Sequence, residues 1–355
     1  MQPGNSHIPL VEVTRGLIVE SVHTGSLVIS QPDGKILFSA GDSTSPVFLR
    51  SAAKPFQTLA FLEQGGAGHY DLEPYEIAII CASHSGTDEH VRVLENLQAK
   101  VGIQESMLQC GIHAPFHIPT AQSKLLKGEA YHSNQHDCAG KHSGMLAFAR
   151  MLAATEENYL EPSHPIQRAM LKTFAEMCAI PEGEILLGTD GCSAPVFAVP
   201  MPNAAAAFAR LCQPDDLAES RATACRLITD AMIRHPDLVG GPQRFDTDVM
   251  SAAAGSLVTK IGAEGYHGIG VLPGKARGFS TSLGIAIKIG DGDLSLRAGC
   301  VVALQVLRHL GALDEDQLRS LPAYDHRPLT NWRGIEIGEI RPSAELRAAL
   351  SHFPA

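Results

Sequence analysis

Two kinds of hydrophobic pattern divide the chain. Near both ends, apolar and β-branched residues alternate with polar ones or form short runs, as they do in strands. Strands are therefore predicted over 11–22, 26–30 and 35–40, and again over 268–272, 278–289 and 294–297. Pro32-Asp33-Gly34 predicts a turn, because proline presets φ and glycine accepts left-handed backbone. A helix is expected around 301–310.

Helical periodicity dominates between these ends. From about 145 to 235, apolar residues recur at three- and four-residue steps, as in Ile166, Met170, Phe174 and Met177. Further helices are predicted after Ser51, ending at Gly65-Gly66, and over 88–100.

This order of elements predicts an α/β (α+β) fold, in which a sheet built from both chain ends carries an inserted, mainly helical region. We expect one lobe from 1–50 and 245–355 and a mainly helical lobe from 51–244. A single catalytic site is expected between the lobes.

Composition and charge narrow the class of protein. The chain has 355 residues, 45% of them hydrophobic, and a formal net charge of -10. It can bury a full core, and it lacks the clustered cations that nucleic acids and anionic membranes require. No apolar stretch reaches 18 residues, and the start MQPGNSHIPL lacks a signal-peptide pattern. The eight cysteines form no Cys-x-x-Cys, which favours reduced thiols and a cytoplasmic protein.

Ser51 and Lys54 carry the first candidate chemistry. A serine hydroxyl needs a base to become nucleophilic, and residues three apart at a helix start share one face. Lys54 can act as that base only if burial or a nearby cation lowers its pKa. The structural alternative is that Ser51 merely caps the helix.

Two later segments add to this pair. Ser83-His84-Ser85 follows an apolar run, and Lys260-Ile261-Gly262 comes late in the chain. Ser-x-x-Lys enzymes of the penicillin-recognising class carry a second polar motif and a late Lys-Thr-Gly in the same order. Ser85 and Ile261 depart from the Asn and Thr of that class, which favours a Ser–Lys hydrolase over a lactam-specific one.

Two cysteines lie among polar residues rather than in apolar helix patterns. His136-Asp137-Cys138-Ala139-Gly140-Lys141-His142 and Thr189-Asp190-Gly191-Cys192-Ser193 surround them. Two thiolates can hold a soft divalent metal, but zinc takes four ligands. Structural cysteines beside tight turns are the alternative.

Five segments, in order, resemble the class 3 (rhizobial-type) L-asparaginases, and the resemblance covers essentially the whole chain. They are Arg50-Ser51-Ala52-Ala53-Lys54-Pro55-Phe56-Gln57, Cys81-Ala82-Ser83-His84-Ser85-Gly86, Cys138-Ala139-Gly140-Lys141-His142, Gly191-Cys192-Ser193-Ala194-Pro195 and Arg244-Phe245-Asp246-Thr247-Asp248. The resemblance implies a serine β-lactamase-like fold, as in glutaminases, a homodimer, and hydrolysis of L-asparagine to L-aspartate and ammonia.

The resemblance also implies roles for individual residues. It pairs Ser51 with Lys54, and Ser83 with Lys260, as two catalytic tandems. It implies a zinc site with water as fourth ligand and three protein ligands, Cys138, Lys141 and Cys192. It places Asp190 at the α-ammonium group of the substrate, and Arg50 and His142 as further substrate contacts.

Three alternatives remain open from the sequence. A serine β-lactamase-like hydrolase would be expected to carry Asn at 85 and Thr at 261. A glutaminase differs in substrate by one methylene, which a site discriminates by only about 1–3 kcal/mol. A non-catalytic zinc or amino-acid binding protein would have no use for paired serines and lysines.

Overall fold

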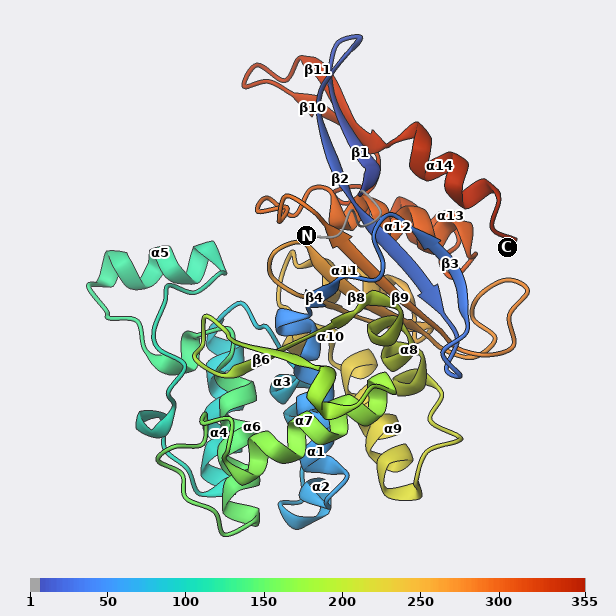
Figure 1. The fold of residues 1–355 in the computed structure, drawn as a ribbon. Helices are drawn as coiled ribbons and strands as arrows, with labels where there is room; N and C mark the ends of the chain where they lie inside the picture. Colours follow the sequence, from blue (N-terminus) through green and yellow to red (C-terminus); the bar gives the residue numbers. More distant parts are fainter. Residues whose placement is uncertain (1–6, 355) are drawn as a thin grey trace. The chain divides into compact units, whose positions relative to one another are not determined.

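The computed structural model describes residues 7–354, which fall into two compact units (Figure 1). The first unit contains the described residues up to Ala52, Ala198–Gln213, and those from Ala252 onward. The second contains Ala53–Phe197 and Pro214–Ser251. Residues 198–213 thus interrupt the predicted helical region and belong to the first unit.

The first unit is built on an antiparallel sheet with the strand order β10-β11-β1-β2-β9-β8-β7, and β3 also pairs with β2. Its strands are β1 (Ile8–Arg15), β2 (Ile18–Ser30), β3 (Ile36–Ala40), β7 (Leu257–Ile261), β8 (Tyr266–Val271), β9 (Leu283–Ile289), β10 (Arg327–Thr330) and β11 (Glu336–Pro342). The N-terminal strands β1 and β2 lie between strands from the C-terminal part of the chain, which confirms the predicted sheet.

Helices cover this sheet within the same unit. They are α8 (Met201–Cys212), α12 (Gly299–His309) and α14 (Ala344–Ser351), and α13 (Glu315–Arg319) packs against α12. Helix α8 packs against β9, β8 and β2, and its alanine-rich face is buried. The short strand β4 (Pro46–Phe48) pairs with the end of β6 (Pro195–Pro200).

The second unit is mainly helical. It contains α1 (Lys54–Leu62), α2 (Gly66–His69), α3 (Pro74–Ile80), α4 (Asp88–Val101), α5 (Ile118–Lys127), α6 (Ala139–Met151), α7 (Pro165–Cys178), α9 (Glu219–Arg234), α10 (Pro236–Val239), α11 (Phe245–Ala252) and the strand β5 (Leu186–Thr189). Every residue of α1 is buried, because α6, α7 and α9 all pack against it. Helix α3 packs against α4, α6 and α9.

Four sequence-based predictions of strands and helices were wrong in detail. The single strand predicted over 11–22 belongs to two strands, because a turn with Gly16 at a left-handed φ of 55° separates β1 from β2. Residues 294–297 form a turn, because the Asp293 carboxylate accepts backbone N–H bonds just before α12 and Leu294 is exposed. Strand β9 starts at Leu283 rather than 278, where Gly278 has a left-handed φ of 76°. The strands β5 and β6 lie within the segment predicted to be helical.

Among residues 7–354, no helix combines the length and apolar composition needed to cross a bilayer.

Candidate active site

Lys54 and Ser83 are two predicted catalytic residues that the structure brings together. Lys54 opens helix α1, directly before Pro55 in the first turn, where a missing N–H costs nothing. Its Nζ donates hydrogen bonds to Ser83 Oγ at 2.8 Å and to the Ala82 carbonyl oxygen at 2.7 Å. Both side chains are buried. The hydroxyl beside the Lys54 amine is therefore that of Ser83, which the resemblance paired with Lys260.

Ser83 is held by the chain that follows helix α3. The apolar run 77–82 closes that helix, and Ser83 then donates its backbone N–H to the carbonyl oxygen of Val239 at 3.0 Å. Two residues later, Ser85 Oγ donates to the carbonyl oxygen of Gly240 at 2.8 Å. These bonds fix the polar string after α3 against residues 239–240.

Ser51 and Lys260 lie in the first unit. Ser51 is half-buried in the 3₁₀ turn Arg50–Ala53, and Lys260 is fully buried in β7. A Cβ at Gly262 would lie 2.2 Å from the carbonyl oxygen of Leu49, so only glycine allows the end of β7 to approach the chain just before Ser51. The helix cap of α1 is Ala53, without a side-chain bond, so Ser51 does not cap α1.

Three predicted metal ligands also converge. Cys138 immediately precedes α6, and Lys141 lies in its first turn. Lys141 Nζ donates to Cys192 Sγ at 2.9 Å, and the thiols of Cys138 and Cys192 interact. All three side chains are buried. Cys192 lies in a tight turn closed by a bond of 2.9 Å from the Asp190 N–H to the Ala194 carbonyl oxygen.

Gly140 allows α6 to approach the end of α3. An ideal Cβ there would lie 1.9 Å from the carbonyl oxygen of Ile79, a backbone atom that cannot move aside cheaply. This close contact brings the first turn of α6, with Cys138 and Lys141, to the segment that ends in Ser83.

The electrostatics of Lys54 are set by its neighbours. Burial alone would lower the pKa of Lys54, but the negative charges of Cys138 and Asp137 outweigh it and raise the pKa above its usual value. Asp137 Oδ2 lies 3.5 Å from Lys54 Nζ. Burial would raise the pKa of Asp137, but the Lys54 ammonium holds it well below its usual range. Lys54 and Asp137 therefore form a buried ion pair.

Two of the predicted substrate contacts lie near the thiols. Asp190 accepts the Gly191 N–H at 2.7 Å, and its charge contributes to the raised pKa of Lys141. His142 Nδ1 is hydrogen-bonded to the Tyr159 hydroxyl at 2.6 Å, and burial lowers the pKa of His142 to about 4. Arg50 lies in the first unit, in left-handed backbone with a φ of 51°.

The donors around Cys192 suit a soft divalent cation. Two thiols and an amine are clustered, and the buried Nε2 of His142 has no hydrogen-bond partner among the described residues. The ring of His142 also interacts with Cys192, which places this imidazole beside the thiols. This set of sulfur and nitrogen donors is one that zinc accepts.

Sequence reasoning gave no role to Asp137 or to His113, although both lie around Lys54 and Cys138. A signal for Asp137 was its place beside Cys138 in a polar segment that turns out to be buried. His113 lies in a loop without periodicity, and nothing in the sequence pointed to it.

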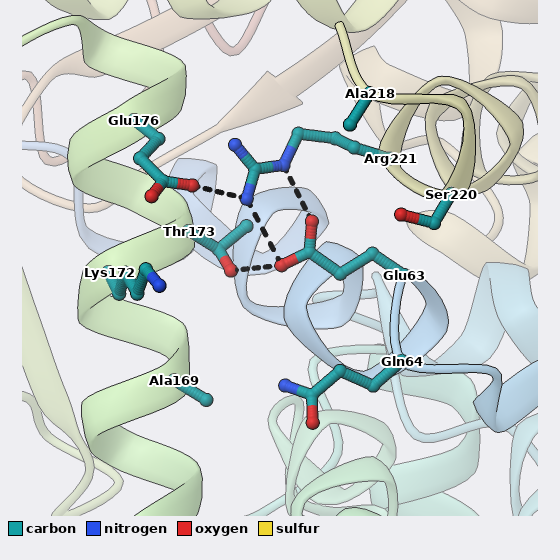
Figure 2. A pocket seen from close by; sticks show the side chains of 9 residues that line it. All are labelled: Glu63, Gln64, Ala169, Lys172, Thr173, Glu176, Ala218, Ser220 and Arg221. Atoms are coloured by element: carbon teal, nitrogen blue, oxygen red, sulfur yellow. Dashed lines mark hydrogen bonds and ion pairs between the residues drawn. The ribbon is translucent and has the colours of Figure 1, made fainter.

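A separate cavity of about 400 Å³ opens between α1, α7 and α9, and none of the predicted site residues lines it. Figure 2 shows the guanidinium of Arg221 between the carboxylates of Glu63 and Glu176, with the Thr173 hydroxyl on Glu63. Arg221 is therefore paired with both carboxylates, and these ion pairs in the cavity wall join α1, α7 and α9.

Comparisons with known proteins place this geometry in context. The family model described as "L-asparaginase II" matches residues 11–342. No curated protein matches the chain. Among solved structures, a probable glutaminase from Bacillus subtilis in complex with 6-diazo-5-oxo-L-norleucine is 17% identical, with 81% of this chain and 84% of that chain covered and a TM-score of 0.37. A Bacillus glutaminase in 4.3 M NaCl is 13% identical, with 80% and 90% covered and a TM-score of 0.37.

Proposed function

The chain belongs to the L-asparaginase II family, and from that premise we propose that it converts L-asparagine to L-aspartate and ammonia through a serine nucleophile served by Lys54. The family makes it an amide-hydrolysing enzyme. One observation carries the finer proposal: the contact of 2.8 Å between Lys54 Nζ and Ser83 Oγ in a buried setting. A serine hydroxyl with a directly bonded amine is the arrangement that nucleophilic catalysis needs.

The proposed reaction runs in two halves. Ser51 Oγ attacks the side-chain amide carbon of asparagine while Lys54 takes the hydroxyl proton. Because Cys138 and Asp137 raise the pKa of Lys54, this step requires that their negative charge is first offset, so that Lys54 is present as the neutral amine. Backbone N–H groups stabilise the oxyanion, each contributing about 3 kcal/mol. The carbon–nitrogen bond then breaks, and Ser83, bonded to the same amine, passes the proton to the departing ammonia with Lys260 as its partner. Water finally hydrolyses the aspartyl-enzyme.

The Lys54–Ser83 contact also supports Ser83 as a second candidate for the acylated serine. A diazo-ketone analogue of asparagine, followed by peptide mass mapping, separates the two. Label on the peptide that contains Ser51, and loss of turnover in Ser51→Ala with an intact fold, are expected. Label on Ser83 instead would exchange the roles of the two serines.

For substrate binding, we propose that the Asp190 carboxylate holds the α-ammonium group. A guanidinium matches a carboxylate in geometry, so Arg50 is proposed for the α-carboxylate, with His142 as a further contact.

We propose Cys138, Lys141 and Cys192 as protein ligands of zinc, with water or His142 Nε2 beside them. When bound, the cation would offset the thiolate charge near Lys54 and help to orient the substrate. Metal analysis of the purified protein tests this: Cys192→Ser should lose the bound zinc, and an unchanged zinc content would remove the proposal.

Ammonia release distinguishes the alternatives. Turnover of asparagine well above that of glutamine, with loss after chelation, supports the proposal. Faster glutamine turnover would make the protein a glutaminase, and nitrocefin cleavage would favour a β-lactamase-like hydrolase. Asparagine binding without ammonia would indicate a binding protein.

The resemblance supports three finer proposals, namely class 3 (rhizobial-type) membership, a homodimer and a cytoplasmic location. Light scattering after size-exclusion chromatography measures the mass in solution, and a monomer would contradict the second. Fractionation of the source cells tests the third.

A further inference from the structure

The hydroxyl of Tyr159 is held beside helix α6. Tyr159 is fully buried in the connection between α6 and α7, and its backbone carbonyl oxygen accepts a bond of 2.9 Å from Gln167 Nε2 of α7. Its ring packs edge-on against the ring of His142, with centroids 5.6 Å apart. The hydroxyl oxygen therefore has a fixed position beside the first turn of α6.

Two hydrogen bonds assign the hydroxyl proton. The Gln109 backbone N–H donates to the Tyr159 hydroxyl oxygen at 2.9 Å, so this oxygen is the acceptor in that bond. The hydroxyl proton then needs an acceptor of its own, because a buried donor without one costs about 1–3 kcal/mol. Among residues 7–354, the acceptor within reach of this hydroxyl is His142 Nδ1, at 2.6 Å. Tyr159 therefore donates to His142 Nδ1.

The tautomer of His142 follows from this bond. An imidazole whose Nδ1 accepts a hydrogen bond is neutral and carries its one proton on Nε2. Nε2 is buried and makes no hydrogen bond to the described residues. The ring interacts with the side chain of Cys192, and because Nδ1 is occupied by Tyr159, the Nε2–H is the group available to this sulfur. The proton also excludes Nε2 as a zinc ligand.

We infer that Tyr159 is a positioning residue, which holds His142 as an Nε2–H donor to the sulfur of Cys192 when Cys192 binds zinc. The inference rests on the proposed zinc site. A thiolate accepts such a bond more strongly than a thiol, because the bond is charge-assisted. Gln109, Tyr159, His142 and Cys192 thus form one chain of donors and acceptors that ends at the metal site, and the fourth position on the metal is left to water.

NMR of the full-length wild-type protein labelled with ¹⁵N-histidine measures the tautomer directly. The His142 signal, assigned by its loss in His142→Gln, should show a proton on Nε2 and none on Nδ1, both without metal and with zinc. A proton on Nδ1 in either form would overturn the inference. Because the metal-free protein gives this result by itself, a failure of zinc binding or of ammonia release would be seen separately.

Tyr159→Phe keeps the ring but removes the hydroxyl, so that the proton of His142 is no longer fixed on Nε2. Zinc affinity, measured by competition with a chelator, should fall about 10- to 100-fold, and the thiolate charge-transfer band of the Co²⁺ form should move to longer wavelength. The matched control is Tyr70→Phe, because Tyr70 also donates its hydroxyl to α6, at the Ala147 carbonyl oxygen; it should change neither value. Wild-type zinc affinity in Tyr159→Phe, or equal weakening in Tyr70→Phe, would contradict the inference.

Discussion

Lys54 Nζ lies 2.8 Å from Ser83 Oγ although 29 residues separate the two in the chain. Their contact depends on the end of α3, where the segment 80–83 returns toward the start of α1. The amine also reaches Asp137, so one buried lysine joins the segments around Ser83 and Cys138. A lysine at this position can act as the base for Ser83, as well as for Ser51 of its own Ser-x-x-Lys motif.

Gly140→Ala should destabilise the protein by at least about 2 kcal/mol. In an ordinary helix this change stabilises by about 1 kcal/mol, so the sign is diagnostic. The new Cβ would meet the Ile79 carbonyl oxygen at 1.9 Å and push α6 from α3. Urea unfolding measures the loss. Gly183→Ala, where no atom lies within 4 Å, is the control and should be neutral or slightly stabilising. Equal stabilities would refute the tight contact.

Stability should fall as pH drops from 6.5 toward 4, partly through His90. Burial lowers the pKa of His90 from 6.5 to about 4, so the unfolded chain binds this proton first. Neutral His90 contributes about 3 kcal/mol to the free energy of unfolding. This contribution is complete above pH 6.5 and is lost progressively below it. The neutral ring accepts the Thr87 N–H and donates to the Asp237 carbonyl oxygen.

His90→Gln keeps the bond to Thr87 in the form usual for a capping box, but cannot titrate. The variant should show a shallower loss of unfolding free energy between pH 6.5 and 4, measured by urea titrations at each pH. His352→Gln, at an exposed position, should leave the slope unchanged. An unaltered slope in His90→Gln would show that other groups dominate.

Glu63→Gln should cost more stability than Glu176→Gln. Both carboxylates bind Arg221, but Glu63 is 12% exposed and also accepts from Thr173, whereas Glu176 is 44% exposed (Figure 2). Charge-assisted bonds in a buried setting contribute about 1.5–3 kcal/mol, and exposed pairs about 0–1 kcal/mol. Urea unfolding measures the stability lost in each variant. A larger loss in Glu176→Gln than in Glu63→Gln would contradict the greater contribution of Glu63.

Much of this fold could be predicted from the pattern of apolar residues. Alternation placed β3 and β8, and helical periodicity placed α1, α4 and α7, because each presents one apolar face to a core. The turn between β1 and β2 was missed, since the apolar pattern runs on through it. The turn at 294–297 could not be predicted, since it depends on one carboxylate that accepts three backbone N–H groups.

The candidate site was predicted in part. Motifs identified Lys54, Ser83, Cys138, Lys141 and Cys192, and the structure brings these residues into two adjoining groups. Their partners could not be read from spacing, because tertiary contacts at Gly140 and Val239 decide which side chains meet. His113 reaches Asp137 from a loop, and no local sequence pattern encodes this contact.

The kcat for ammonia release from asparagine by Lys54→Met tests the role of Lys54 most directly. The change removes the amine but keeps the length of the side chain, and pairing it with Asp137→Asn avoids leaving a buried carboxylate unpaired. Loss of the base should lower kcat at least about a hundredfold, while the exposed variant Lys127→Met stays at the wild-type rate. A folded Lys54→Met protein that releases ammonia within threefold of the wild-type rate would contradict the proposed catalytic role of Lys54.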